Sequence, residues 1–187
     1  MEDEAKLVLE TTKEGMEGAV KHLEKEYVQI RAGKADIRVF DDVTVDYYGT
    51  MTALPQASNI SAPDAKTIMI QPWDKSLIPL IEKAIMAANL GFTPANNGEV
   101  IRIQIPPLTE ERRRDLVKRA KEVAENAKIG IRGQRRTAND ELKKMQKDGL
   151  GEDMCKDYQA NVQELHDKYI KDIDEMAKLK ETDIMTI

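Results

Sequence analysis

The amino-acid sequence predicts an α+β fold: an elongated antiparallel three-helix bundle into which a small β/α/β domain is inserted. Apolar residues recur at helical spacing in three long segments, at about residues 4–31, 108–147 and 152–182. Between the first two segments, the spacing changes to short alternating runs typical of strands. The composition, with 4% aromatic and 34% charged residues, favours helices with solvated outer faces over a β-sandwich.

The middle segment carries two parallel rows of side chains. The core stripe consists of Leu116, Ala120, Val123, Ala124, Ala127, Ile131, Ala138, Leu142 and Met145. About a third of a turn away stands the basic row, which consists of Arg114, Lys118, Lys121, Glu125, Lys128, Arg132, Arg136, Asn139 and Lys143. Residues 112–147 contain 13 Lys/Arg and 5 Asp/Glu, a net charge of +8, whereas the whole chain carries −5 and the remainder therefore −13. We predict one helix that concentrates positive charge on an acidic protein.

The two outer segments each have one apolar stripe. In the first it comprises Leu9, Met16, Val20, Leu23, Tyr27 and Ile30. In the last, a heptad pattern places apolar residues in two columns, Cys155, Val162, Tyr169 and Met176 in one and Tyr158, Leu165 and Leu179 in the other. Because each helix alone would expose its stripe to water, we expect residues 1–30 and 106–187 to close one bundle core.

Residues 31–105 have the pattern of the inserted β/α/β domain. Val45 and Tyr47 alternate before a turn at Gly49, and strands are predicted at residues 68–70 and 100–105 around a helix at 75–89. For Trp73, packing at the corner between strand and helix is expected in preference to the alternative, a platform for base stacking. The chain crosses between the domains twice, and Pro106 stiffens the second crossing. The predicted hinge consists of Arg31, Ala32, Gly33, Gln104, Ile105, Pro106 and Pro107.

Catalytic and metal-binding constellations find little support. His22 has no second ligand at metal spacing, and Cys155 lies in an apolar stripe without a neighbouring base. One cysteine rules out an internal disulfide and suits a reducing compartment. The acidic N-terminus differs from a targeting peptide, and no apolar run approaches the roughly 20 residues that span a bilayer. We expect a cytoplasmic, monomeric protein without membrane association, cofactor or metal, and an enzymatic function is the weakest hypothesis.

The basic row admits two interpretations, a solvated helix face or a binding surface. Segregated charge signs and the clustered arginines Arg132, Arg135 and Arg136 favour binding of phosphate groups. Without interleaved aromatic residues, phosphate contact with folded RNA or duplex fits better than base stacking. Arg135 lies nearer the core stripe and is expected to be partly structural. The predicted RNA contacts are Arg112, Lys118, Lys121, Lys128, Arg132, Arg135 and Arg136, and we expect this edge to be free of intramolecular carboxylates.

Several motifs resemble the ribosome recycling factor family over essentially the whole chain. They are Ile30-Arg31-Ala32-Gly33-Lys34-Ala35, Val45-Asp46-Tyr47-Tyr48-Gly49, Pro72-Trp73-Asp74, Leu90-Gly91-Phe92-Thr93-Pro94, Ile101-Arg102-Ile103-Gln104-Ile105-Pro106-Pro107-Leu108-Thr109-Glu110-Glu111-Arg112-Arg113 and Arg132-Gly133-Gln134-Arg135-Arg136-Thr137-Ala138-Asn139-Asp140. The resemblance implies a three-helix bundle and a hinged β/α/β domain in a bent, L-shaped molecule. It also implies that Arg132, Arg135 and Arg136 contact large-subunit rRNA. Gly130, Gly133 and Thr137 depart from the family pattern.

The function that the resemblance implies is ribosome recycling after translation termination. Such a factor binds the large ribosomal subunit and, with elongation factor G and GTP, splits the post-termination complex so that mRNA and tRNA leave. The alternative that the charge pattern leaves open is an rRNA-binding helical adaptor or RNA chaperone without a GTPase partner. A subunit-splitting assay with and without elongation factor G and GTP distinguishes the two.

Overall fold

The structure is a computed structural model that describes residues 1–30 and 32–186. The chain divides into two compact units, one formed by Met1–Ile30 and Arg113–Ile187 and the other by Arg31–Arg112. Arg31, one of the predicted hinge residues, lies outside the described residues. The hinge itself therefore stays a prediction, and each unit is described by itself.

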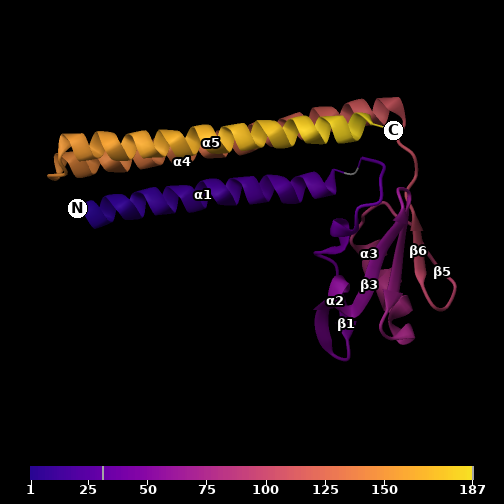
Figure 1. Ribbon diagram of the computed structural model, residues 1–187. Coiled ribbons are helices and arrows are strands. Elements are labelled where there is room, and N and C mark those ends of the chain that lie inside the picture. The colour runs from indigo at the N-terminus through magenta and orange to yellow at the C-terminus, as the bar shows by residue number, and fades with distance from the viewer. Residues whose placement is uncertain (31, 187) are drawn as a thin grey trace. The chain divides into compact units, whose positions relative to one another are not determined.

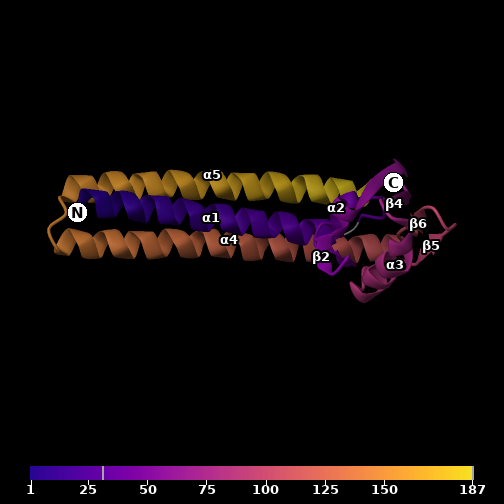
Figure 2. The same cartoon turned by 90° about the horizontal axis from the view of Figure 1, so that it is seen from below.

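The first unit is a bundle of three long helices that lie side by side in Figures 1 and 2. They are α1 (Glu2–Gln29), α4 (Glu110–Lys147) and α5 (Glu152–Met185). Helix α4 runs antiparallel to the other two. Leu142, near the end of α4, clusters with Ala5 near the start of α1 and with Cys155 near the start of α5. At 1.5 Å per residue, its 38 residues span about 57 Å. Thr109 caps the start of α4, since its Oγ1 accepts a hydrogen bond of 3.1 Å from the backbone N–H of Arg112.

The core stripe of α4 closes the bundle as the spacing predicts. Its buried members are Leu116, Ala120, Ala124, Ile131, Ala138 and Leu142. Two phenols tie the helices together: Tyr27 Oη donates to the backbone carbonyl of Ala120 at 3.0 Å, and Tyr169 Oη donates to Glu17 Oε1 at 3.1 Å. Helix α1 is thus hydrogen-bonded to α4 through Tyr27 and to α5 through Tyr169.

One predicted core position in α5 is wrong. Leu179 is 72% exposed, and Ile173 and Ile184 are buried instead. An α-helix turns 3.6 residues per turn, so a strict seven-residue spacing drifts by about 20° per heptad around a straight helix. By the last two turns of α5, the drift has rotated the column that contained Leu165 away from the core.

The second unit contains a hairpin and a four-stranded antiparallel sheet in the order β3-β4-β6-β5. The hairpin strands are β1 (Thr44–Tyr47) and β2 (Thr50–Ala53). The sheet strands are β3 (Ser58–Asp64), β4 (Thr67–Pro72), β5 (Pro94–Asn96) and β6 (Ile101–Gln104). The helical segments are η1 (Ile37–Phe40), α2 (Leu54–Ala57), η2 (Lys75–Leu77) and α3 (Ile78–Ala87). Buried isoleucines of β4, β6 and α3 form the core, namely Ile68, Ile70, Ile101, Ile103, Ile78, Ile81 and Ile85.

Within the second unit, three of the predicted hinge positions have defined environments. Gly33 adopts φ 73°, and a Cβ at this position would lie 2.9 Å from Leu108 Cγ, so only glycine fits without strain. The backbone N–H of Ile105 donates to the carbonyl of Lys66 at 2.7 Å, which extends the pairing of the sheet by one residue. Ala32 is buried. Gln104, Pro106 and Pro107 are exposed.

The titration of Tyr169 tests the packing of α5 against α1. Burial and the hydrogen bond to Glu17 raise the pKa of Tyr169 to about 12. Because folding raises this pKa, the protonated phenol contributes to the free energy of unfolding. This contribution is complete below the ordinary pKa of about 10 and is lost as the pH rises through about 12. In an absorbance titration at 295 nm, Tyr169→Phe should lose the phenolate transition near pH 12 and about 1–2 kcal/mol of stability at neutral pH. A variant that kept this transition would show that another phenol titrates there.

Candidate nucleic-acid interface

The seven predicted RNA contacts all lie on α4 but differ in exposure. Arg112, Lys118, Lys121, Arg132 and Arg136 are exposed, whereas Lys128 and Arg135 are half-buried. Their rotation about the helix axis follows from the buried stripe, since residues three and four apart share a face. The residues therefore form a solvent-facing row with two members that turn towards the neighbouring helix.

Three of these cations have carboxylate partners, so the expectation of an edge free of intramolecular carboxylates is wrong for them. Arg132 Nη1 lies 2.9 Å from Glu125 Oε1 on α4 itself. Lys121 Nζ lies 3.5 Å from Glu181 Oε1, and Lys128 pairs with Asp174. The last two pairs arise because α5 runs antiparallel to α4, so acids seven residues apart on α5 meet lysines seven residues apart on α4.

The pair between Arg132 and Glu125 leaves the guanidinium available for exchange. The side chains are 49% and 54% exposed, and an ion pair in such a position contributes about 0–1 kcal/mol. A guanidinium carries five N–H donors, of which one is directed at Glu125. A phosphate group can therefore replace the carboxylate or bind beside it at small energetic cost.

Arg135 belongs to a polar network that joins α4 to α5. Its Nη1 donates to Gln163 Oε1 at 3.0 Å, and Gln163 Nε2 donates to Asp167 Oδ1 at 2.8 Å. The hydrogen bonds from His166 and Gln163 lower the pKa of Asp167. Arg135 Nε and Asn139 Oδ1 are both buried, and neither has a hydrogen-bond partner in the part of the chain that the structure describes. Arg135 is thus partly structural, as its place beside the core stripe predicts.

Arg136 differs from the other two clustered arginines in its partners. It is exposed, and no salt-bridge partner lies near it among residues 1–30 and 32–186. Gly133 lies about 60° further around the helix than Arg136, and nothing is within 4 Å of its Cβ position. Arg136 therefore borders a stretch of helix surface with no side chain, where a phosphate chain can approach closely.

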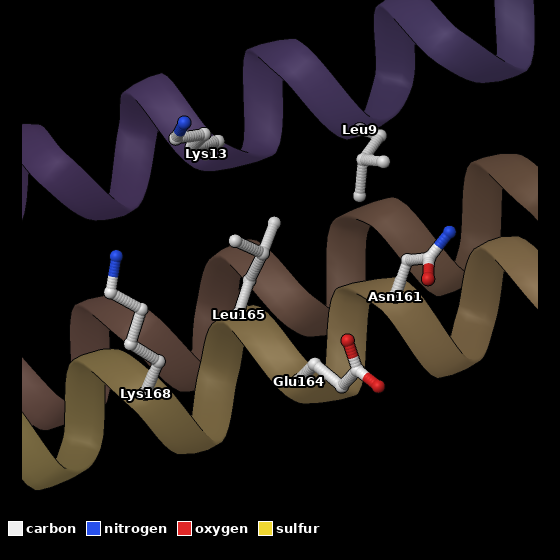
Figure 3. A pocket seen from close by; sticks show the side chains of 6 residues that line it. All are labelled: Leu9, Lys13, Asn161, Glu164, Leu165 and Lys168. Atoms are coloured by element: carbon white, nitrogen blue, oxygen red, sulfur yellow. The ribbon is translucent and has the colours of Figure 1, made fainter.

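The bundle also has a groove that lies apart from these cations. A groove of about 320 Å³ runs between α1 and α5 and is lined by Leu9, Lys13, Asn161, Glu164, Leu165 and Lys168. Figure 3 shows the two lysine side chains at one end of it. Its lining contains none of the α4 cations and includes the carboxylate of Glu164, so it does not extend the candidate interface.

Metal-binding clusters and membrane-spanning helices are absent from the described part of the chain. Within residues 1–30 and 32–186, no group of three or more His, Cys, Asp or Glu side chains is arranged to hold a metal ion. No helix in these ranges has the length and apolarity that crossing a bilayer requires. Cys155 is buried and its thiol donates to the carbonyl of Leu142 at 3.5 Å.

The fold defines a class of protein: a two-unit α+β protein whose β/α unit lies in the chain between the first and second helices of a three-helix bundle. Residues 23–185 match the family described as ribosome recycling factor. The ribosome-recycling factor of Flavobacterium johnsoniae is 54% identical over 187 residues, all of both chains, and that of Porphyromonas gingivalis is 53% identical over 173 residues, or 92% of this chain and 93% of that one. The chain belongs to the ribosome recycling factor family, which confirms the resemblance found in the sequence.

Solved structures agree with this assignment. A solution structure of ribosome recycling factor superposes with a TM-score of 0.85 at 35% identity and covers 98% of each chain. A second structure is described as the Thermus thermophilus ribosome recycling factor and the Escherichia coli elongation factor G bound to the E. coli post-termination complex. Its recycling factor gives a TM-score of 0.67 at 38% identity, over 97% of this chain and 99% of that one.

The open helix surface at Gly133 yields a stability test. Glycine in the interior of a helix destabilises it by about 0.5–1 kcal/mol relative to alanine, and the Cβ position here is unobstructed. Gly133→Ala should therefore raise the free energy of unfolding in urea by about that amount. Gly149→Ala is the control and should lower it, because Gly149 has φ 118°. A loss of stability in Gly133→Ala would show that α4 is not a regular helix beside the arginines.

Proposed function

We propose that this chain recycles ribosomes after translation termination by binding the large subunit and, with elongation factor G and GTP, splitting the post-termination complex. Membership of the family over residues 23–185 supports this function, as does 54% identity to the ribosome-recycling factor of Flavobacterium johnsoniae along the full chain. The solved relative described together with elongation factor G on the post-termination complex supports that factor as the partner. The proposed place of action is the cytoplasm.

The observation that carries the proposed rRNA contact is the exposure of Arg132 and Arg136 on a strongly basic helix. Residues 112–147 hold a net charge of +8 on a chain of −5, and a phosphate backbone is attracted to such a row. The acidic remainder of the chain repels RNA. Nonspecific binding of the protein along RNA is therefore disfavoured, and binding in one RNA groove that fits α4 is preferred. Arg135, whose Nη1 is directed at Gln163, contributes its remaining N–H donors at the edge of this contact.

The mechanism we propose divides the work between the two units. The bundle binds rRNA through α4, whose 38-residue length makes it a stiff element. The second unit moves about a hinge near residues 31–33 and 104–107 when elongation factor G engages it. Nucleotide hydrolysis on the partner supplies the free energy that separates the subunits. An adaptor or RNA chaperone without a GTPase partner would bind ribosomes equally well but would not split them faster when elongation factor G and GTP are added.

Replacing Arg132 tests the phosphate contact. Arg132→Ala should weaken binding to ribosomes about tenfold and reduce the slope of log affinity against log salt by about 1, because one charge-assisted contact to phosphate is lost. The midpoint of thermal unfolding should hardly move, since the ion pair with Glu125 that is removed is exposed. Cosedimentation at several salt concentrations and thermal melts measure both quantities.

Lys156→Ala is the matched control for Arg132→Ala. It also removes an exposed ion pair within one helix, since Lys156 Nζ lies 2.7 Å from Glu152 Oε1, and both side chains are 66% exposed. We expect wild-type ribosome affinity for this variant because it lies on α5. If Arg132→Ala lowered the stability while ribosome binding persisted, the basic row would be structural and the proposed contact wrong.

Glu125 offers the opposite test. Its carboxylate competes with phosphate for Arg132 and repels the RNA backbone, so Glu125→Gln should raise the ribosome affinity by about two- to fivefold at low salt. The gain should shrink as salt is added, because the charges are exposed. Cosedimentation at low salt and at a several-fold higher salt concentration measures it. A decrease in affinity would mean that the pair with Glu125 holds Arg132 in its binding conformation.

A further inference from the structure

Two large aromatic side chains in the second unit are exposed to solvent, and a hydrogen bond holds each of them in place. Tyr48, in the turn between β1 and β2, is 77% exposed, and Trp73, just after β4, is 64% exposed. The phenol of Tyr48 donates a hydrogen bond to the carboxylate of Asp74, the residue next to Trp73. The indole Nε1 of Trp73 donates to the backbone carbonyl of Gln56 at 2.8 Å. The prediction that Trp73 packs at a corner is therefore wrong: its polar edge is satisfied and most of its surface is open.

Tyr48 is held in a conformation that aromatic residues rarely adopt. Its φ is 49° and that of Gly49 is 83°, as in the two-residue hairpin turn that normally takes Asn-Gly or Gly-Gly. The turn is closed by Asp46 Oδ1, which accepts the N–H of Gly49 at 2.8 Å. The ring of Tyr47 packs edge-on against Tyr48 with centroids 4.9 Å apart. A strained residue whose side chain is fixed by its neighbours and exposed to solvent is typical of a binding position.

The charges near the two rings in the sequence are mostly negative. Residues 39–65, which contain the hairpin, include the four aspartates Asp41, Asp42, Asp46 and Asp64 and no Lys or Arg. Asp74, next to Trp73 in the chain, adds a carboxylate, and the hydrogen bond from Tyr48 lowers its pKa. The adjacent cation, Lys75, is paired with Glu99, whose Oε1 lies 3.3 Å from Lys75 Nζ. Such a surface repels phosphate and attracts cations, and the face of an aromatic ring binds a guanidinium well.

The size of the surface limits what it binds. Two mostly exposed aromatic side chains present on the order of 300 Å² of contact area. This is less than half of what one partner contributes to a standard protein–protein interface. A short segment of chain therefore suits the surface better than the face of a globular domain, and rings that are already ordered lose little entropy when it binds.

We propose that Tyr48 and Trp73 form a docking surface for a short, arginine-bearing segment of a protein in the ribosomal complex. Arginine side chains stack on the two rings, and Asp74 and the aspartates of the hairpin region attract their charge. The surface has the opposite chemistry to the basic row of α4, so one unit binds RNA and the other binds protein. The inference rests on the proposed function because the partner is sought on the ribosome.

Photo-cross-linking tests this surface directly. The full chain carries p-benzoylphenylalanine in place of Tyr48 in one variant and of Trp73 in a second, and each is irradiated with ribosomes of Flavobacterium johnsoniae. Both variants should form cross-links that protease removes and nuclease does not, and mass spectrometry should place them in a segment with arginine. If the variant at position 48 fails to fold, as a thermal melt would show, the variant at position 73 gives the result alone.

Met51 provides the matched control on the same hairpin. It is 66% exposed and pairs with Asp46, whereas Tyr47 pairs with Thr50, so Met51 projects from the other face of the hairpin. The photoreactive residue at position 51 should give at most about a tenth of the protein cross-link found at position 48. Cross-links to RNA, equal yields at 48 and 51, or none from positions 48 and 73 in a protein that cosediments with ribosomes would overturn the docking surface. If the wild-type chain failed to cosediment, the proposed function itself would fall.

Discussion

The burial of one apolar stripe on α4 determines where every charge on that helix stands. Leu116, Ile131 and Leu142 are nearly inaccessible to water, and Leu142 packs against α1 and α5. Burying side chains of this size stabilises a fold by about 1.5–3 kcal/mol each. Rotating α4 by a third of a turn would expose them and bury cations instead. The basic row is therefore fixed at the edge of the bundle by hydrophobic packing and not by its own interactions.

The neighbouring helix then sorts the cations of α4 into two groups. Those that face α5, Lys121 and Lys128, meet its acids, and Arg135 meets Gln163. Those that face away, among them Arg136, are exposed to solvent. One helix therefore has two roles. The cations that face α5 help to hold the bundle together, and the arginines that face away stay available for phosphate. Arg132 lies between the groups, with a carboxylate partner that is itself exposed.

Sequence patterns suffice for the features that depend on a single helix, and fail for those that depend on neighbours. The core stripe, the N-cap at Thr109 and the bundle helices follow from local spacing and chemistry. The edge strands β3 and β5 escape prediction because they contain Pro63 and Pro94 and are mostly exposed, so they lack the alternation that marks a half-buried strand. The ion pairs of Lys121 and Lys128 depend on the register between α4 and α5, which no local pattern specifies. For the exposure of Trp73 the sequence holds no local signal, since its charged neighbours Asp74 and Lys75 are of opposite sign.

The location of the RNA contact can be measured with an iron chelate that generates hydroxyl radicals. Cys155 is buried, so a single surface cysteine introduced at Gly133→Cys carries the chelate on the exposed surface of α4 beside Arg136, and Lys178→Cys on α5 carries it elsewhere on the bundle. On ribosomes of Flavobacterium johnsoniae, we expect strong, localised cleavage of large-subunit rRNA from position 133 and weak or different cleavage from position 178. Cleavage from position 178 alone would contradict the assignment of RNA binding to the basic row of α4.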